Sequence, residues 1–377
     1  MNYRTHIVSS LSEIGKEAWD GLLARQAQAN PFLSYAFLHA LHESGSASPE
    51  TGWQPQYIAL YDGEGLAAAL PLYVKDHSYG EYVFDWAWAD AYQRHGLDYY
   101  PKLLAAIPFT PVAGPRLLAV DDAARAALID VLCATQRATD VSSTHVLFPP
   151  EAHARQLQDA GFLLRSGVQF HWLNPGYASF DEFLGTLEQK KRKNIRAERR
   201  KVREAGVTMR RVRGTEATDA HWTFFNRCYR HTYAAHHSTP YLNLDFFRRI
   251  GASMPGNILL VFAERGGRPI AASLVIHDAD TLYGRYWGEL EHVPCLHFEA
   301  AYYQPLEFCI EQGIQTFEGG AQGEHKMARG FLPTRTFSAH WLAHPSFADA
   351  IERFLAREAG GIDEYMSELN ERNPFKA

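Results

Sequence analysis

Part of the sequence occurs twice. When the chain is compared with itself at an offset of 204 residues, stretches 59–101 and 263–305 align without a gap and share 11 identities in 43 positions. The identical pairs are Ala59/Ala263, Gly63/Gly267, Ala67/Ala271, Ala68/Ala272, Leu70/Leu274, Asp76/Asp280, Tyr79/Tyr283, Gly80/Gly284, Tyr82/Tyr286, Tyr99/Tyr303 and Pro101/Pro305. Internal similarity of this length predicts two copies of one domain. The alternative is coincidence, because the Gly turns, Ala and Tyr of any two β-hairpins match readily.

Hydrophobic periodicity gives a similar order of elements in both halves. In the first half it predicts helices at 12–27 and 34–44 and strands at 56–61 and 66–74. In the second half it predicts strands at 258–264, 270–277, 281–288, 314–318 and 336–343 and helices at 297–312 and 323–330. Antiparallel strands followed by a helix and a further strand indicate a mixed α/β (α+β) sheet fold. We expect tandem duplicated domains, 1–165 and 166–377, with a basic helical insertion at 180–205.

The insertion has the signals of one long helix over residues 177–205. Ser179 and Glu182 form a capping box, and Gly206 is placed to end the helix. One narrow apolar stripe is formed by Leu184, Leu187, Ile195 and Val202. Because the stripe is narrow, we expect only one side of the helix to pack on the body of the protein.

Positive charge is concentrated on this helix and just after it. Residues 190–213 hold 12 of the 37 Lys and Arg residues but only two acids, Glu198 and Glu204. Such a run repels itself unless an anion neutralises it. We therefore expect the following side chains to bind phosphate groups or another polyanion: Lys190, Lys191, Arg192, Lys193, Arg196, Arg199 and Arg200. The alternative is a solvated charged helix.

Polar side chains and glycines gather after the predicted strand 314–318. Acyl transfer to an amine needs a base, donors for the oxyanion and often an acid for the leaving group. The candidates for these catalytic roles are Glu318, Glu324, His325, Lys326 and Glu299. The glycines at 319, 320 and 323 let backbone amides approach a carbonyl or phosphate closely. The candidates for substrate contact are Tyr286, Trp287, His297, Gln322 and Arg329. The alternatives are a favourable interaction with a helix dipole for Glu299, a solvated surface role for His325, Lys326 and Arg329, and core packing for Tyr286 and Trp287.

The sequence lacks the motifs of several other kinds of functional site. The histidines and the four cysteines show no metal-ligand spacing, so we expect no metal, and there is no Gly-x-Ser-x-Gly elbow or Gly-x-x-x-x-Gly-Lys-Ser/Thr loop. The cysteines are too scattered for a disulfide framework, and no signal sequence or membrane-spanning run is present. We expect a cytoplasmic protein without integral membrane insertion.

Five segments resemble a bacterial family of predicted N-acyltransferases. They are Phe170-His-Trp-Leu-Asn174, the basic run from Lys190 to Lys201, Leu282-Tyr-Gly-Arg-Tyr-Trp-Gly288, Leu296-His-Phe-Glu299 and the stretch from Phe317 to Phe331. That family is similar to the FemAB peptidoglycan-bridge aminoacyl transferases and, more distantly, to the GNAT superfamily. The resemblance implies a tandem GNAT-like fold, which agrees with the internal repeat. Lys326 stands where the FemAB pattern has a lysine before a Gly-Phe step, which implies a role in holding negative charge.

The resemblance also implies the reaction, the formation of an amide by transfer of an acyl or aminoacyl group to an amine acceptor. GNAT enzymes hold the pyrophosphate of the acyl donor at a Gly-rich turn, whereas residues 289–297 contain no glycine and two glutamates. Three phosphate-bearing co-substrates stay open as donor, namely aminoacyl-tRNA, acyl-CoA and an acyl-carrier protein, and we expect no permanently bound cofactor. The acceptor is a small amine or a cell-wall precursor. The alternative function is non-catalytic binding of nucleic acid or a cell-wall precursor on a degenerate acyltransferase fold.

Overall fold

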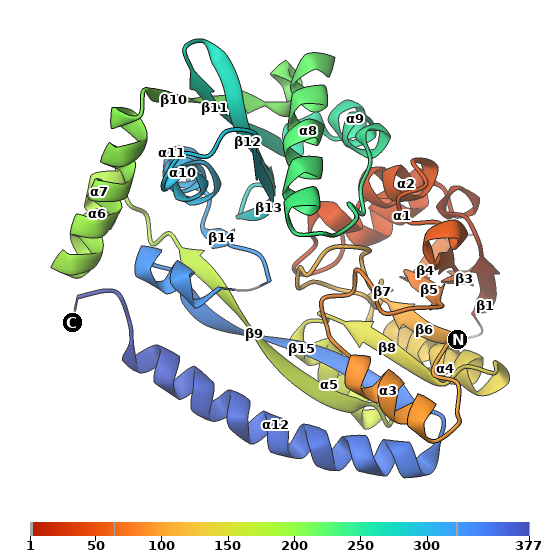
Figure 1. Cartoon of the computed structure of the whole chain (residues 1–377). Helices are drawn as coiled ribbons and strands as arrows, with labels where there is room; N and C mark the ends of the chain where they lie inside the picture. Colours follow the sequence, from red (N-terminus) through yellow and green to blue (C-terminus); the bar gives the residue numbers. More distant parts are fainter. Residues whose placement is uncertain (1–2, 64, 322, 377) are drawn as a thin grey trace. The chain divides into compact units, whose positions relative to one another are not determined.

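The computed structural model describes residues 3–63, 65–321 and 323–376 (Figure 1). The chain forms two compact units, which we call unit 1 (residues 1–168 and 335–365) and unit 2 (residues 169–334 and 366–377). The units interleave along the chain, since residues 335–365 return to unit 1, whereas the predicted domains 1–165 and 166–377 follow one another. The ranges 1–165 and 166–377 therefore stay a prediction of where the two duplicated domains begin and end.

Unit 1 contains a four-stranded antiparallel sheet in the order β1-β3-β4-β7. Its strands are β1 (Arg4–Val8), β3 (Tyr57–Asp62), β4 (Gly65–Leu70) and β7 (Leu118–Ala119). A second group of strands runs β15-β8-β6-β5-β2, formed by β2 (Trp53–Pro55), β5 (Leu72–Lys75), β6 (Lys102–Ala105), β8 (Ser143–Leu147) and β15 (Leu332–Leu342). The helices are α1 (Lys16–Leu23), α2 (Tyr35–Glu43), α3 (Trp86–Arg94), α4 (Asp122–Ala138) and α5 (Glu151–Asp159), with short 3-10 turns at Leu11–Glu13, Pro31–Leu33 and Pro49–Thr51.

Unit 2 is built on strands in the order β10-β11-β12-β13-β14-β9. They are β9 (Leu163–Leu173), β10 (Val207–Arg213), β11 (Ile258–Arg265), β12 (Arg268–His277), β13 (Thr281–Glu289) and β14 (Thr316–Glu318). Its helices are α6 (Phe180–Thr186), α7 (Gln189–Glu204), α8 (Asp219–Ala235), α9 (Leu244–Ser253), α10 (Leu296–Phe298), the π-helix η6 (Glu299–Tyr303), α11 (Gln304–Gln312) and the 3-10 helix η7 (Glu324–Arg329). Two further 3-10 turns span Gly214–Glu216 and Pro255–Asn257. The long helix α12 (Pro345–Glu371) runs from unit 1 into unit 2.

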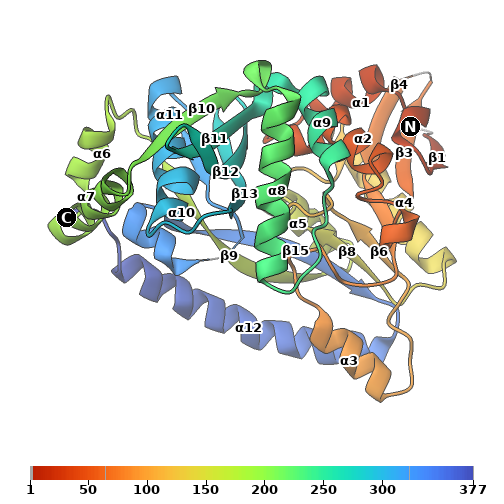
Figure 2. The ribbon, with the colours of Figure 1, turned by 45° about the horizontal axis from the view of Figure 1, so that its top comes forward.

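Helices cover both faces of the unit 2 sheet, with α8 on one face and α10 and α11 on the other (Figures 1 and 2). Helix α8 approaches the sheet so closely that a Cβ atom at Gly288 of β13 would lie 2.1 Å from the backbone oxygen of Cys228. The hydroxyl of Thr232 on α8 also donates to the backbone oxygen of Trp287, at 3.0 Å. A glycine is therefore required on β13 at this point.

The duplication is confirmed at the level of elements. In each unit a strand, two helices, three antiparallel strands and a helix follow in order, with β1-β3-β4-β7 in unit 1 matching β10-β11-β12-β13 in unit 2. Each copy has a register shift in its central hairpin, between Leu60 and Tyr61 in one and between Ala263 and Glu264 in the other. The predicted mixed α/β class is likewise confirmed.

The residue-by-residue match beyond Leu70 is wrong. Tyr286 lies on β13, whereas Tyr82 lies in a loop with a φ of 62°. In unit 1 the strand that corresponds to β13 is β7, which begins only at Leu118, because residues 71–117 are inserted after β4 and contribute β5, α3 and β6. An ungapped comparison pairs this insertion with β13 and its following helix, which have a different structure.

The predicted basic helix is two helices, α6 and α7. Leu187 has an extended backbone, with ψ at 154°, and pairs as an isolated bridge with Phe375. The helix therefore breaks where the chain near its end docks against it, since the backbone amide of Glu188 also donates to the oxygen of Pro374. The apolar stripe is buried as expected, and Gly206 ends the segment with a φ of 73°.

Candidate functional site

The loop after β14, which carries the cluster predicted from the sequence, is bordered by two strands. Strand β14 pairs in parallel with β13, with Glu318 opposite Tyr283, and antiparallel with β9, with Glu318 opposite His171. Gly320 and Gly323 have φ angles of 86° and 119°, so the loop uses backbone conformations that other residues rarely adopt. Gln322, predicted to contact substrate, lies outside the described residues.

Lys326 is the most unusual side chain of this loop. Its relative exposure is 2%, and its Nζ donates to the backbone oxygen of Gly320 at 3.0 Å. Its stem packs on Gly319, where an added Cβ would lie 3.0 Å from the lysine Cδ. Burial lowers the pKa of Lys326 to about 8. An amine of this acidity gives or takes a proton near neutral pH, as acid–base catalysis requires.

Aromatic and imidazole rings surround the outer side of the loop. The Nε2 of His325 lies 3.3 Å from the hydroxyl of Tyr302, and the ring of His297 contacts the rings of Trp287 and Tyr302. Partial desolvation by the neighbouring side chains and the positive charges of Arg329 and Lys326 lower the pKa of His325, an exposed residue, below its usual value. For His297, burial and the neighbouring His325 lower the pKa to about 4. Both imidazoles are therefore neutral at pH 7.

Arg329, predicted to contact substrate, is engaged inside the protein. Its guanidinium donates to the hydroxyl of Tyr303, to the backbone oxygen of His325 and to both carboxylate oxygens of Glu198 on α7. Its central carbon lies 3.4 Å from the centre of the Phe298 ring, and the residue is 5% exposed. These contacts bind the guanidinium of Arg329 within the protein, so it is not available to a substrate.

Glu299, predicted as a catalytic carboxylate, also serves another purpose. Both its oxygens accept from Arg199, at 3.0 and 2.8 Å, and one accepts from Gln304 at 2.8 Å. Arg199 donates further to Glu307 at 2.6 Å. Glu299 is 4% exposed, so its carboxylate neutralises Arg199 and is not available as a base. Because these carboxylates already pair with its guanidinium, Arg199 is not available to bind a polyanion.

Of the other predicted candidates, Glu324 and Tyr286 are accessible. Glu324 is exposed and forms an ion pair with Arg372 at 3.3 Å. Tyr286 and Trp287 are half-buried on β13, and the Tyr286 ring packs edge-on against Tyr229 of α8.

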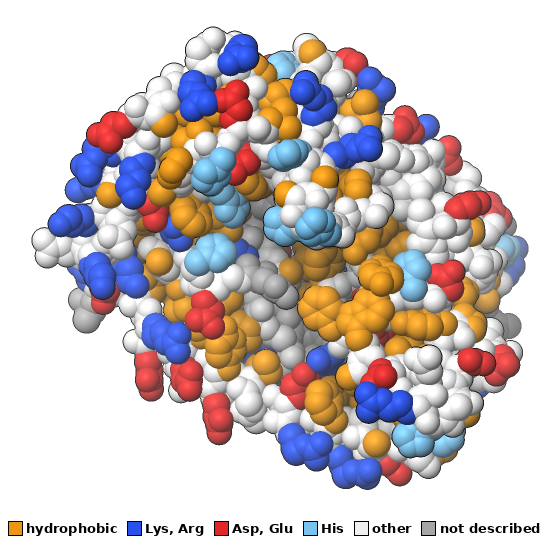
Figure 3. Space-filling model, in the orientation of Figure 1, with side chains coloured by type: hydrophobic (Ala, Val, Ile, Leu, Met, Phe, Trp, Pro, Cys, Tyr) orange, Lys and Arg blue, Asp and Glu red, His pale blue; other side chains and the backbone are white. Residues whose placement is uncertain are grey.

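The basic residues of α7 divide into an inner and an outer set. Arg192 donates to the backbone oxygens of Gly185 and Leu187, at 3.4 and 3.3 Å. The outer set is an exposed row at i, i+3, i+7 and i+10, formed by Lys193, Arg196, Arg200 and Arg203. Figure 3 shows blue Lys and Arg side chains gathered at the left of the view, where Figure 1 draws α6 and α7.

A cavity of about 400 Å³ lies beside this outer row. It is lined by Phe180, Asp181, Leu184, Arg196, Arg199, Arg200, Arg203 and Glu307. Arg199 and Glu307 of this lining pair with each other, and the remaining three guanidinium groups outnumber the carboxylate of Asp181, so the lining is positive. Such a surface attracts phosphate groups.

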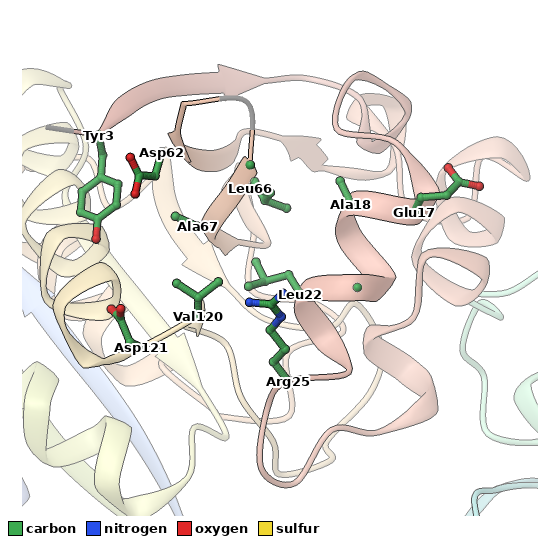
Figure 4. A pocket seen from close by; sticks show the side chains of 12 residues that line it. Tyr3, Glu17, Ala18, Leu22, Arg25, Asp62, Leu66, Ala67, Val120 and Asp121 are labelled. Atoms are coloured by element: carbon green, nitrogen blue, oxygen red, sulfur yellow. The ribbon is translucent and has the colours of Figure 1, made fainter. Parts of the chain in front are cut away.

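Unit 1 has a cavity of about 510 Å³ between α1 and the edge of its small sheet (Figure 4). Arg25 and Leu22 point toward its centre, with Tyr3, Asp62 and Asp121 on the opposite side. Its lining contains three carboxylates and one arginine but no His, Lys or Cys. We therefore assign no acyl-transfer chemistry to this cavity.

His171 of β9 lies beside the loop that carries Lys326 but was not among the residues predicted from the sequence. Burial and the charge of Lys326 lower the pKa of His171 to about 4, which places this neutral imidazole in the field of the buried lysine. Its Nε2 lies 3.2 Å from the Oε1 of Gln169. The only available signal was its place in the run Phe170-His-Trp-Leu-Asn174, because the register that sets it opposite Glu318 is a tertiary feature.

The described residues are also expected to hold no metal site and no membrane-spanning segment. Nowhere within residues 3–63, 65–321 and 323–376 do three or more His, Cys, Asp or Glu side chains group so that they would hold a metal ion. Over the same ranges, no helix combines the length and the apolar character needed to cross a membrane.

Comparison with known proteins places this geometry in context. The model of the FemAB-like family, described as peptidoglycan biosynthesis/recognition, matches residues 10–377. No curated protein matches the sequence.

Solved structures share the fold at low sequence identity. The crystal structure of FemX is 12% identical, covers 93% of this chain and 100% of its own, and has a TM-score of 0.58. The C-terminal domain of a putative lysylphosphatidylglycerol synthetase from Agrobacterium fabrum is 10% identical, with 92% and 97% covered and a TM-score of 0.54. L-PGS from Bacillus licheniformis is 11% identical, with 90% and 96% covered and a TM-score of 0.53.

Proposed function

Because the chain belongs to the FemAB-like family, we propose that it forms an amide by transferring an acyl or aminoacyl group from a phosphate-bearing donor to an amine acceptor, with its reactive centre at the loop between β14 and η7. The observation that carries the proposal is Lys326. Among the described residues no carboxylate forms an ion pair with it, although it is buried and its pKa is near 8. Buried lysines without a counter-ion are costly, and such groups concentrate at functional sites.

The reaction begins when the acceptor nitrogen attacks the carbonyl carbon of the donor ester or thioester. The new carbon–nitrogen bond leaves negative charge on the carbonyl oxygen, which the Lys326 ammonium stabilises in a site of low dielectric constant. The carbon–oxygen or carbon–sulfur bond to the donor then breaks. Lys326 gives its proton to the leaving group, which its lowered pKa favours.

The acceptor nitrogen must also lose a proton. His325 is neutral at pH 7, is exposed and lies within reach of Tyr302, so it is suited to accept that proton. Glu318 and Glu324, which flank the glycines of the same loop, are the other candidates for the base. Trp287 and His297 provide flat surfaces for the substrate beside Tyr302 and this loop, whereas Tyr286, the other predicted aromatic contact, packs on Tyr229 at the opposite face of the sheet.

The phosphate-bearing part of the donor is assigned to the outer row of α7. Lys193, Arg196, Arg200 and Arg203 lie along one face, spaced over ten residues or about 15 Å of helix. An extended set of cations favours a donor with several negative charges. Aminoacyl-tRNA, acyl-CoA and an acyl-carrier protein all meet this condition, and the acceptor is a small amine or a cell-wall precursor.

A donor panel tests the proposal. Purified protein is incubated with mixed aminoacyl-tRNAs, acetyl-CoA or acyl-carrier protein and a set of primary amines, and amide products are measured by mass spectrometry. We expect one donor class to be consumed by the wild-type protein and Lys326→Ala to lower turnover by about 10²-fold.

The exposed Lys16, in unit 1, provides the matched control as Lys16→Ala, and thermal melts verify folding. Equal turnover in Lys326→Ala and wild type would refute the assigned centre. If no donor is consumed but one binds, the chain is a binding protein on this fold instead.

A further inference from the structure

Helix α7 carries functional groups on two opposite sides. The outer row faces solvent, whereas Glu198 turns inward and accepts from the guanidinium of Arg329, at 3.0 and 2.9 Å, and from the hydroxyl of Tyr303. Glu198 is thus the point at which α7 meets η7, the short helix that carries Lys326.

Arg329 joins three elements through these contacts. Besides Glu198 of α7, its Nε donates to Tyr303 of η6 at 3.0 Å, and its third nitrogen donates to the backbone oxygen of His325 in η7 at 2.8 Å. The ring of Phe298 covers its face at 3.4 Å. Every nitrogen of the guanidinium therefore has a protein partner, which fixes its position.

The helix that Arg329 holds has little rigidity of its own. Helix η7 is a 3-10 helix of six residues, and glycines with positive φ stand at both ends, Gly323 at 119° and Gly330 at 89°. In a 3-10 helix, residues three apart lie above one another, which places Lys326 directly over Arg329 along the axis. An anchor at Arg329 therefore controls where Lys326 lies.

We propose that Arg329 is a positioning residue which, clamped by Glu198 of α7, holds Lys326 in its buried place against the backbone oxygen of Gly320. This inference rests on the proposed function in one respect: the catalytic role proposed for Lys326 is the reason why its position matters. It also connects the helix that carries the outer cations to the loop that carries the lysine. When the clamp is broken, η7 loosens and the Lys326 amine gains access to water.

A purely electrostatic effect of breaking the clamp would shift the pKa of Lys326 in the opposite direction, so a measurement of that pKa distinguishes the two explanations. The titratable and charged groups facing Lys326 are His171 of β9, His297 of α10, and His325 and Arg329 of η7. Replacing Glu198 by Gln leaves the charge of Arg329 without its counter-ion, which disfavours a second positive charge nearby and lowers the pKa of Lys326. Loosening of η7 hydrates the amine and raises its pKa toward the value of an ordinary lysine.

The test measures the amine itself and not turnover. The full chain is labelled with trace acetic anhydride between pH 6 and pH 11, and the labelling of Lys326 is followed by peptide mass spectrometry. We expect a midpoint at about pH 8 in the wild-type protein and a rise of at least about one pH unit in Glu198→Gln.

Glu311→Gln is the matched control, because Glu311 accepts two bonds of 2.8 Å from Arg211 in the same unit but is not bonded to η7. We expect its midpoint to equal that of the wild-type protein. If Glu198→Gln does not fold by thermal melt, Tyr303→Phe removes only the bridging hydroxyl and should raise the midpoint by a smaller amount. A midpoint that stays the same or falls in the folded variant would overturn the proposal, whatever the outcome of the donor panel.

Discussion

Arg199 and Arg196 lie close together on α7, yet their environments predict very different contributions to stability. The side chain of Arg199 is 16% exposed and pairs with the side chains of Glu299 and Glu307, which are 5% and 24% exposed. The side chain of Arg196 is 58% exposed and pairs with Asp181, which is 81% exposed. We therefore expect the first arginine to stabilise unit 2 and the second to be nearly neutral.

The magnitudes follow from burial. Arg199→Met keeps an apolar stem but leaves the Glu299 carboxylate buried without its cation, and breaking a buried pair in this way costs about 3–5 kcal/mol. The partial exposure of Glu307 puts our expectation at the lower end, about 3 kcal/mol. An exposed pair contributes about 0–1 kcal/mol, so Arg196→Met should change the free energy of unfolding by no more than about 0.5 kcal/mol.

Urea unfolding followed by tryptophan fluorescence and by circular dichroism measures both variants. If the unfolding curves from the two probes coincide, each protein unfolds in a single cooperative transition and the free energies of unfolding can be compared. Equal losses in the two variants, or a loss below about 1 kcal/mol for Arg199→Met, would refute the division of α7 into structural and outer cations.

Two further predictions concern the outer row and unit 1. Changing Lys193, Arg196, Arg200 and Arg203 to Glu should abolish salt-sensitive binding of the phosphate-bearing donor, because charge contacts with a polyanion weaken steeply with ionic strength. Binding titrations from about 50 to 300 mM salt measure this effect, and an unchanged affinity at low salt would contradict the prediction. In unit 1, burial and the neighbouring His145 hold the pKa of His340 well below its usual value, while burial and Lys102 lower that of His145 to about 3, and the two Nδ1 atoms lie 2.7 Å apart. Since both folded-state values lie below those of the unfolded chain, stability should be lost as pH falls from about 6.5 toward 3, and urea midpoints should depend less on pH over this range in His340→Gln than in the wild-type protein.

Local patterns predicted much of the fold, and long-range contacts explain most of the errors. The strands at 258–264, 270–277 and 281–288 differ from β11, β12 and β13 by at most two residues at each end, because alternation and turns mark them clearly. The break at Leu187 escaped detection because it depends on Phe375, which is distant in the sequence. The false equivalence of Tyr82 and Tyr286 arose because the insertion contains the same Tyr-Gly-x-Tyr pattern as the strand it was aligned with.

The candidate site shows the same division. Lys326 was identified from its place after a glycine-rich turn, and the structure adds that it is buried. Local patterns could not predict that Glu299 neutralises Arg199 or that Glu198 holds Arg329, since these pairs join residues about 100 or more positions apart. His171 likewise became visible only through the register of β9 and β14. The family and the acyltransferase class, inferred from resemblance, are confirmed by the match over residues 10–377.

The pH dependence of transfer tests the central claim most directly. If the Lys326 ammonium protonates the leaving group, kcat with the donor found in the panel should fall as pH rises through about 8, because the deprotonated lysine has no proton to give. In Lys326→Arg, whose guanidinium stays charged, this fall should disappear up to pH 10 while kcat at pH 7 is lower than in the wild-type protein. A fall near pH 8 that persists unchanged in Lys326→Arg would contradict the account and assign the titrating group to another residue.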